Sequence, residues 1–268
     1  MEALRQIADW PVPLAAAGAL VDGRVETEGD SGRRFRLASV SKPVTALALL
    51  VAAEEGVVDL DEPAGPPGST VRHLLAHASG LPFDGTAPIA APGTRRVYSN
   101  AGFRLLGAHL GQRAEMPFAE YVRAAVVEPL GIGLDPTGDP GSGMHASVAD
   151  VLALARELLQ PTVVAPETLD ELTAVQFPGL AGVLPDWGRF EPLDWGLGVQ
   201  LATSPPTWMG ARVSRRAFGH FGGSGTFLWV DPELGLACGA LADRDFGDWA
   251  KTAWPALSDA VVEEASRS

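Results

Sequence analysis

Hydrophobic and polar residues alternate with a period of two near both ends of the chain, whereas the middle follows the three-to-four spacing of helices. Near the start, two apolar segments flank Asp22-Gly23, a dipeptide typical of a tight β-hairpin. A short N-terminal helix is expected before this hairpin. The expected strands cover residues 14–21, 24–28, 195–201, 216–220, 226–230 and 236–241. The expected helices cover residues 40–55, 71–77, 101–113, 117–129, 147–159 and 246–265.

This order of elements predicts an α+β fold, arranged as an α/β sandwich. Strands from both chain ends would form one antiparallel sheet, flanked by the N- and C-terminal helices, with a helical subdomain inserted between them. We assign residues 1–36 and 190–268 to the sheet subdomain and residues 37–189 to the mostly helical one. The stretch 178–194, rich in Pro, Gly and Trp, is expected to be loop-rich. The active site is expected in the cleft between the subdomains.

The expected helix over residues 40–55 should be buried, because apolar residues occupy nearly all of its sides. Pro43 is tolerated only near a helix start, so the first turn must begin close to Ser39. Asp59 and Asp61 are expected to solvate the turn that follows. Thr70 is suited to cap the start of the next helix.

The chain of 268 residues carries a formal net charge of −13, which makes nucleic acids and anionic membranes poor partners. No apolar run reaches the roughly 18 residues of a membrane span, and the N-terminus lacks the basic segment of a signal peptide. The single cysteine, Cys238, lies in an apolar run and is expected to be a buried free thiol. These features favour a cytoplasmic protein with no nucleic-acid or membrane partner, and they leave the oligomeric state open.

Only two lysines occur in the chain, and Lys42 stands three positions after Ser39. Residues three apart on a helix have Cβ atoms about 5–6 Å apart, so the amine can reach the hydroxyl. Burial would lower the lysine pKa from its usual value of about 10.4 and let the neutral amine act as a base. The Ser39 N–H, unused at a helix start, can point at a developing oxyanion. The alternative is a helix cap beside a surface charge.

The only asparagine, Asn100, stands two positions after Tyr98, which is one of two tyrosines. Tyr98 can carry a proton to the leaving group of a substrate. Asn100 can donate to a substrate carbonyl while it accepts a hydrogen bond from Lys42. Alternatively, the Tyr-Ser-Asn segment is only a turn that caps the next helix.

Glycines surround His220 in the segment GHFGGSG, immediately before the expected strand 226–230. Glycine at a strand edge lets a substrate backbone approach closely, so Gly222, Gly223 and Ser224 are expected to bind substrate. His220 would project towards the same pocket, and the Gly223 N–H could be a second oxyanion donor. A dinucleotide loop is excluded because the glycines precede a strand and not a helix. The alternative is a glycine bulge with a solvated histidine.

These motifs resemble those of the penicillin-recognising serine hydrolases, in particular the class C β-lactamases with their esterase and D-stereospecific peptidase relatives. The resemblance rests on LASVSKPVTA, VRHLLAHASGLP, YSNAGFRLLG and GHFGG, and it covers nearly the whole chain. It implies a β-lactamase/transpeptidase-like fold in which Ser39 is acylated and Lys42 and Tyr98 transfer protons. Asn100 would bind substrate, and the N–H groups of Ser39 and Gly223 would form the oxyanion hole.

The resemblance implies a serine hydrolase with no metal or other cofactor that acts on small ester, amide or β-lactam substrates. His220 takes the position of the family's lysine, and a neutral histidine attracts a carboxylate less, so small esters should suit the pocket better. One alternative is a penicillin-binding or sensor protein that acylates at Ser39 with little turnover. Another is a scaffold with an inactive pocket. Whether Lys42 or Tyr98 takes the first proton stays open.

His73 and His77 are four apart on an expected helix, the spacing of two zinc ligands. Position 74 is leucine where a zinc peptidase needs glutamate, and no third ligand is evident, so we expect a structural role. Both histidines are expected to bond the backbone of the Ser79-Gly80 turn. Three tryptophans are expected to pack in the core, with pocket lining as the alternative: Trp187, Trp195 and Trp208.

Overall fold

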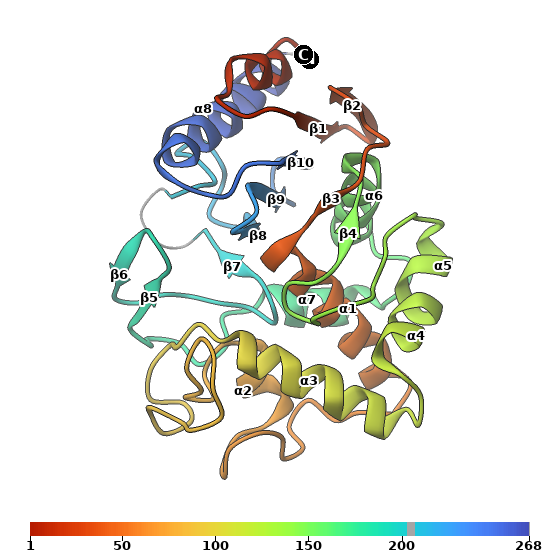
Figure 1. Ribbon diagram of the computed structural model, residues 1–268, viewed down its shortest axis with the longest axis vertical. Coiled ribbons are helices and arrows are strands. Elements are labelled where there is room, and N and C mark those ends of the chain that lie inside the picture. Colours follow the sequence, from red (N-terminus) through yellow and green to blue (C-terminus); the bar gives the residue numbers. More distant parts are fainter. Residues whose placement is uncertain (203–206, 268) are drawn as a thin grey trace.

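The computed structural model describes residues 1–202 and 207–267 of the chain. Six strands form an antiparallel sheet in the order β2-β1-β10-β9-β8-β7 (Figure 1). Two come from the start of the chain and four from its later part, as the hydrophobic pattern predicts. Their bounds are Ala15–Val21 (β1), Arg24–Glu28 (β2), Gln200–Leu201 (β7), Phe218–Gly222 (β8), Thr226–Asp231 (β9) and Leu236–Ala242 (β10).

The first hairpin turns at Asp22 and Gly23, whose φ angles of 48° and 76° are both left-handed. Two left-handed residues in succession form the turn that matches the twist of a hairpin. Beyond it, β1 pairs over its whole length with β10, beginning with Ala15 opposite Ala242. The two ends of the chain therefore meet inside the sheet.

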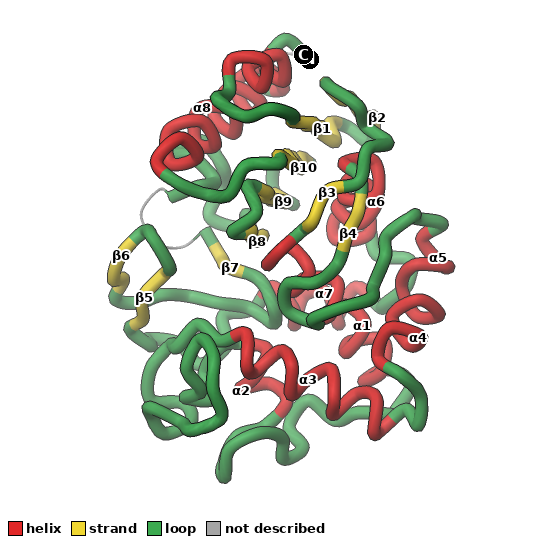
Figure 2. Tube along the Cα trace, viewed as in Figure 1, coloured by secondary structure: helices red, strands yellow, loops and turns green. Residues whose placement is uncertain are grey.

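Alternate side chains of the sheet contribute to two hydrophobic cores. Trp229 of β9 packs with the N-terminal 3-10 helix η1 and the C-terminal helix α8. Its neighbour Leu228 belongs to the other core, which contains helices α1 and α6. Figure 2 shows η1 and α8 on one side of the strands and α6 on the other. These elements are Ala3–Asp9 (η1), Ser41–Glu54 (α1), Val148–Leu159 (α6) and Asp248–Ala265 (α8).

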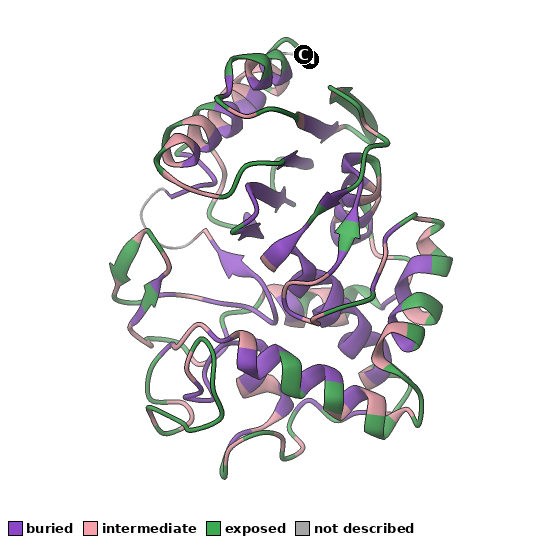
Figure 3. Cartoon of the chain, viewed as in Figure 1, coloured by how far each residue is buried: buried purple, intermediate pink, exposed green. Residues whose placement is uncertain are grey.

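Helix α1 is the central element of the helical part, and 12 of its 14 residues are buried, as its apolar sequence predicts (Figure 3). None of the helices in the described part of the chain is long and apolar enough to cross a membrane. The remaining helical elements are Val71–Leu75 (α2), Asn100–Arg113 (α3), Phe118–Val122 (α4), the π-helical turn Arg123–Val127 (η3), Glu128–Leu130 (α5) and Pro166–Thr173 (α7).

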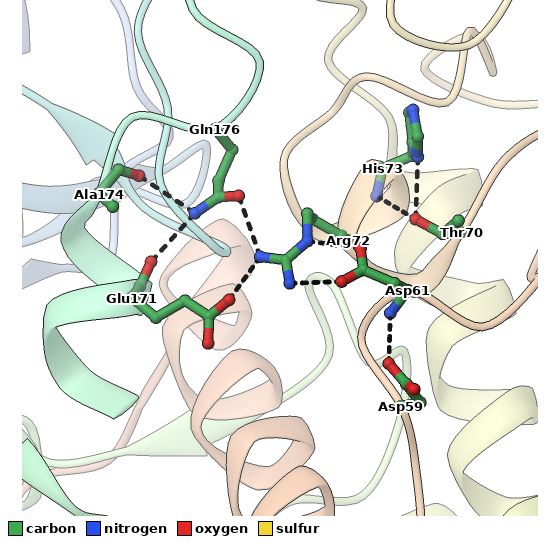
Figure 4. Close-up of polar contacts among 8 residues, drawn as sticks. All are labelled: Asp59, Asp61, Thr70, Arg72, His73, Glu171, Ala174 and Gln176. Atoms are coloured by element: carbon green, nitrogen blue, oxygen red, sulfur yellow. Dashed lines mark hydrogen bonds and ion pairs between the residues drawn. The ribbon is translucent and has the colours of Figure 1, made fainter. Parts of the chain in front are cut away.

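Arg72 of α2 joins three segments of the helical part (Figure 4). Its guanidinium binds both carboxylate oxygens of Asp61, at 2.7 and 2.9 Å, and one oxygen of Glu171 at 2.7 Å. Gln176 accepts a further hydrogen bond from it at 3.2 Å. Asp59 accepts the N–H of Asp61 within the turn, at 2.8 Å. The expectation that Asp61 only solvates a turn was therefore wrong, because this carboxylate anchors α2.

The expected strand over residues 195–201 is reduced to the two residues of β7. Gly198 is left-handed, with a φ of 75°, and a Cβ on it would lie 2.6 Å from the Cβ of Ala46 in α1. The segment therefore turns against α1 where the alternating pattern predicts an extended strand. Tertiary packing overrides the local pattern here.

Two short pairings were not expected from the sequence. The stretch 178–194 contains a hairpin of Gly182–Leu184 (β5) and Gly188–Phe190 (β6), and Phe35–Arg36 (β3) pairs with His145–Ala146 (β4). The helix expected over 117–129 is divided into α4, the π-helical turn and α5. The subdomain boundaries at residues 36 and 190 stay a prediction, since α6 comes from the middle of the chain but packs on the sheet.

Candidate active site

Ser39 lies in a short 3-10 turn, η2 (Ala38–Val40), between β3 and α1. Ala38 has a left-handed φ of 44°, which costs a residue with a side chain about 1–2 kcal/mol. The turn is held by the N–H of Leu37, which donates to the carbonyl of Met144 at 2.9 Å. Ser39 itself is only partly buried, so a substrate can reach its hydroxyl.

Lys42 follows at the start of α1 and is fully buried. Its Nζ lies 3.1 Å from Ser39 Oγ, 2.7 Å from Asn100 Oδ1 and 2.9 Å from the carbonyl oxygen of Gly141. A neutral amine has two N–H donors, which the two carbonyl oxygens can use, and one lone pair, which is left for the Ser39 hydroxyl. Burial lowers the pKa of Lys42 to about 7, although the carboxylate of Asp139 opposes this shift.

The loop that contributes Gly141 was not recognised from the sequence. Asp139 accepts the N–H of Gly141 at 2.8 Å, and the hydroxyl of Thr45 in α1 donates to the carbonyl of Pro140 at 2.6 Å. A Cβ on Gly141 would lie 2.9 Å from that of Phe103, so only glycine fits here. The Asp-Pro-Gly turn pattern was a visible signal, although it does not indicate which partner the loop meets.

The hydroxyl of Tyr98 lies 3.4 Å from Nε2 of His220. The other ring nitrogen, Nδ1, lies 2.7 Å from the carbonyl oxygen of Phe221, which can only accept. Nδ1 therefore carries the proton and Nε2 accepts from Tyr98. Burial, together with the charge of Lys42, holds the pKa of His220 well below its usual range, so the ring is neutral. Burial raises the pKa of Tyr98, against a hydrogen bond with Ser39, so the phenol keeps its proton.

Asn100 is the first residue of α3, and the side chain of Ser99 caps this helix by accepting the N–H of Gly102 at 2.9 Å. The Asn100 N–H donates to the carbonyl of Phe83, also at 2.9 Å, which sets the direction of its side chain. Since its Oδ1 accepts from Lys42, only the amide hydrogens are left, and they have no partner among residues 1–202 and 207–267. The segment is thus both a helix cap and a potential substrate contact.

The turn between β8 and β9 lies against the segment that precedes Ser39. The Ser224 hydroxyl donates to a backbone carbonyl of that segment at 2.6 Å, and a Cβ on Gly222 would lie 2.3 Å from the carbonyl oxygen of Leu37. Next to them, the N–H groups of Ser39 and Gly223 donate no backbone hydrogen bond within the described residues. A Cβ on Gly223 would meet only open space. As substrate and oxyanion contacts, these residues stay predictions.

Of the two histidines, only His73 lies in α2, which ends at Leu75, whereas His77 follows the helix with a left-handed φ of 54°. Thr70 caps α2 as predicted, by accepting the His73 N–H, and its hydroxyl lies 2.9 Å from His73 Nδ1. His77 Nδ1 accepts the N–H of Ser99 at 3.2 Å, and its ring packs against that of Tyr98 at a tilt of 37°, with centroids 4.4 Å apart. The expected bonds to the turn after α2 were therefore wrong. His77 instead holds the segment that carries Tyr98.

Trp195 and Trp208 are fully buried, which confirms the predicted core packing, whereas Trp187 is half-buried. Trp195 also packs against Tyr98 and His220, with ring centroids 5.8 and 5.4 Å apart. Trp195 therefore belongs to the core and also packs against two residues of the site. The sequence alone could not distinguish between these two roles.

Comparisons with known proteins identify the family and the fold. A family model described as beta-lactamase matches residues 12–134 and 131–261. A crystal structure described as a beta-lactamase from Mycobacterium bovis is 50% identical, with a TM-score of 0.96, and the match covers 98% of this chain and 99% of that one. A structure titled EstCE1, a hydrolase with promiscuous acyltransferase activity, shares the fold at 19% identity and a TM-score of 0.79, over 97% of each chain.

Two curated proteins are more distant relatives. Esterase EstB from Burkholderia gladioli is 25% identical over 85% of this chain and 81% of its own length. Penicillin-binding protein 4* from Bacillus subtilis (strain 168) is 28% identical over 37% of this chain. That second match spans only 29% of the relative, so most of the relative's length has no counterpart in it.

Proposed function

Because this chain belongs to the beta-lactamase family of serine hydrolases, we propose that it hydrolyses small esters and amides through a covalent acyl-enzyme at Ser39. One observation carries the proposal: the fully buried amine of Lys42 lies 3.1 Å from the Ser39 hydroxyl. A serine hydroxyl is a weak nucleophile until a base takes its proton. With a pKa lowered by burial to about 7, Lys42 can be that base near neutral pH.

In the acylation step, Lys42 takes the proton of Ser39 while Oγ attacks the carbonyl carbon of the substrate. The N–H groups of Ser39 and Gly223 stabilise the oxyanion that forms, and Asn100 donates to the substrate through its free amide hydrogens. Tyr98 then protonates the leaving group and is reprotonated by the Lys42 ammonium, so that on balance the alcohol or amine gains the one proton that Ser39 lost. In deacylation, a water molecule gives a proton to the Lys42–Tyr98 pair as it attacks the acyl carbon, and Ser39 takes a proton back from this pair as the acid leaves.

Lys42 is the first base in this scheme. Burial has opposite effects on the two candidates, because it disfavours the charged form of each. It lowers the pKa of Lys42, which favours the neutral amine that a base must be, and it raises the pKa of Tyr98, which disfavours a phenolate base. Tyr98 therefore acts as a proton donor and His220 as the acceptor that orients its hydroxyl.

The environment of His220 favours ester and amide substrates that have no carboxylate next to the scissile bond. Its ring is 2% exposed and uncharged, so it does not offer the cationic group that would attract a carboxylate next to the scissile bond. Hydrolysis of β-lactams is a second candidate, which the 50% identical structure described as a beta-lactamase supports. Parallel assays with p-nitrophenyl butyrate and nitrocefin separate the two.

We also propose that the partners of this protein are small molecules, with no nucleic acid or membrane among them, and that it acts in the cytoplasm. The net charge of −13 supports the first statement, since nucleic acids and anionic lipids would be repelled. Cell fractionation tests the location. Recovery of the protein in an extracellular or membrane fraction would contradict it.

The nucleophile is tested with Ser39→Ala, which should lower the turnover of p-nitrophenyl butyrate at least about a thousandfold. Ser31→Ala, in a turn of the connection between β2 and β3, is the matched control and should keep full activity. Intact-mass spectrometry of the wild type should detect a transient acyl adduct on Ser39. An active Ser39→Ala protein would remove the assignment, and a persistent adduct without product would favour a sensor with little turnover.

A further inference from the structure

A cavity of about 370 Å³ lies beside Tyr98, between the β5–β6 hairpin and the segment that runs from Phe83 to Tyr98. Figure 1 shows the hairpin and this loop next to each other at one edge of the molecule. The ring of Phe83 stacks on that of Tyr98, with centroids 5.9 Å apart and planes at 24°. The cavity therefore begins at a side chain that the proposed reaction uses.

Part of the wall of this cavity is formed by exposed apolar side chains. Phe83, Ile89 and Val183 line it and are 50%, 56% and 57% exposed. They are three of the nine large hydrophobic residues that are exposed in the described part of the chain. Exposed apolar surface gathered in one concave site is typical of ligand pockets, because a ligand that covers it removes it from water.

Two arginines, Arg95 and Arg189, also line the cavity. Arg189 pairs directly opposite Val183 in the β5–β6 ladder, so the two side chains share one face of the hairpin. Arg95 makes no hydrogen bond or ion pair with the described residues, and Arg189 has only an exposed contact with Glu191 at 3.3 Å. In a chain with a net charge of −13, these guanidinium groups form a local cationic site.

Their neighbour Arg96 is different, although it also borders the cavity. It is buried and its guanidinium donates to four backbone carbonyls, including those of Ala76 and Gln176 at 2.6 and 2.7 Å. Arg96 therefore fixes the loop through its backbone contacts. Arg95 takes no part in these contacts, so its guanidinium stays exposed and charged.

The spacing along this segment sets the length of ligand that fits. Arg95 precedes Tyr98 by three residues, and the segment between them bridges in parallel to Gly182 of β5. At about 3.3 Å per residue, the backbone of Arg95 lies roughly 10 Å from that of Tyr98, and both residues line the cavity. An extended carbon chain of about eight bonds covers that distance.

We propose that this pocket selects esters or amides with an apolar arm of about six to eight carbons that ends in a carboxylate or similar anion, bound by Arg95 and Arg189. The inference rests on the proposed hydrolytic function and names its substrate class. It agrees with the neutral surroundings of His220, because the anion binds at the end of the arm and not beside the scissile bond.

The test compares kcat/KM for p-nitrophenyl monoesters of dicarboxylic acids, from glutarate to sebacate, with methyl-ended esters of equal length. A second arm uses butyrate esters of ω-hydroxy acids, which carry the anion on the alcohol side. In one of these two substrate series we expect kcat/KM to be at least about tenfold higher for the anionic compound than for its methyl-ended counterpart, with the largest ratio near eight carbons. The double variant Arg95→Gln/Arg189→Gln should remove this preference. Arg24→Gln, on the exposed strand β2, is the matched control and should keep the preference.

The outcomes separate this inference from the proposed function. Ser39-dependent hydrolysis without any arginine-dependent preference in either arm would overturn the inference and leave the hydrolase intact. If no ester is turned over, titration of monomethyl suberate and dimethyl suberate into the Ser39→Ala protein decides the matter, because only the first has a terminal carboxylate. Monomethyl suberate should then bind about tenfold tighter, and equal affinities, or tight binding that survives the double arginine variant, would overturn the proposal.

Discussion

Replacing Lys42 with methionine should change how the stability of the protein depends on pH. Burial lowers the pKa of this amine from 10.5 to about 7, and each pH unit of difference corresponds to about 1.4 kcal/mol. The buried amine therefore destabilises the fold by about 5 kcal/mol below pH 7, where it must be charged in both states. Methionine has a similar length and no charge, so it removes this effect at every pH.

The direction of the pH dependence follows from the number of protons that Lys42 binds in the folded and in the unfolded state. Between pH 7 and about 10.5, the unfolded chain holds a proton on Lys42 that the folded chain does not, so the stability of the wild type rises with pH. Below pH 7 this contribution is flat. The free energy of unfolding of Lys42→Met, minus that of the wild type, should therefore fall by about 1.4 kcal/mol per pH unit between pH 7 and 10.

The size of the stability difference between Lys42→Met and the wild type at a given pH also depends on the hydrogen bonds that the variant loses. Asn100 Oδ1 and the Gly141 carbonyl each lose a donor in Lys42→Met, at roughly 1–3 kcal/mol for each unpaired buried oxygen. The variant should thus be up to a few kcal/mol more stable than the wild type at pH 6. Its activity should fall about 10²–10⁴-fold, because the base is gone.

Urea unfolding followed by tryptophan fluorescence at pH 6, 7, 8 and 9 measures the difference. Lys251, the only other lysine, lies in α8 and is paired with Asp248 at 3.2 Å on the surface. Lys251→Met is therefore the matched control and should add no such slope. A Lys42→Met difference that stays constant from pH 7 to pH 9 would refute the argument that burial of this amine creates the base.

Three other predictions concern the same framework. The kcat/KM of the wild type should fall tenfold per pH unit below about 7, because protonated Lys42 cannot accept a proton; a profile flat down to pH 5 would contradict this. His220→Gln keeps an acceptor for Tyr98 and should be about tenfold more active than His220→Phe, whereas equal rates would exclude the orienting role. Arg96→Met should lose about 3 kcal/mol of unfolding free energy, and Arg95→Met less than about 0.5, both measured with urea.

The site residues that could be predicted from sequence are those whose chemistry is rare in this chain. Two lysines, two tyrosines and one asparagine leave few ways to assemble a base, a proton donor and an amide, and the structure brings Lys42 into contact with Asn100 and Ser39. Gly141 could not be found in this way. It contributes a backbone carbonyl, which every residue has, and only the folded loop determines its partner.

Some parts of the fold could likewise be predicted from the sequence, and others could not. The hairpin at Asp22-Gly23 and the all-apolar helix α1 follow from local sequence, because turn chemistry and burial act within a few residues. The segment 195–201 does not, since its conformation depends on the close approach of Gly198 to Ala46 in α1. The β5–β6 hairpin was missed because each strand has only three residues, too few to show an alternating pattern.

The near-complete burial of α1 affects how this protein can evolve. The helix carries the reacting amine and is also the centre of the larger hydrophobic core, so a substitution there alters chemistry and folding together. The rim formed by Ile89, Arg95 and Arg189 has no such constraint, since these residues are exposed. Homologues should therefore diversify their preferred compounds by changes at this edge, while the interior around position 42 stays nearly invariant.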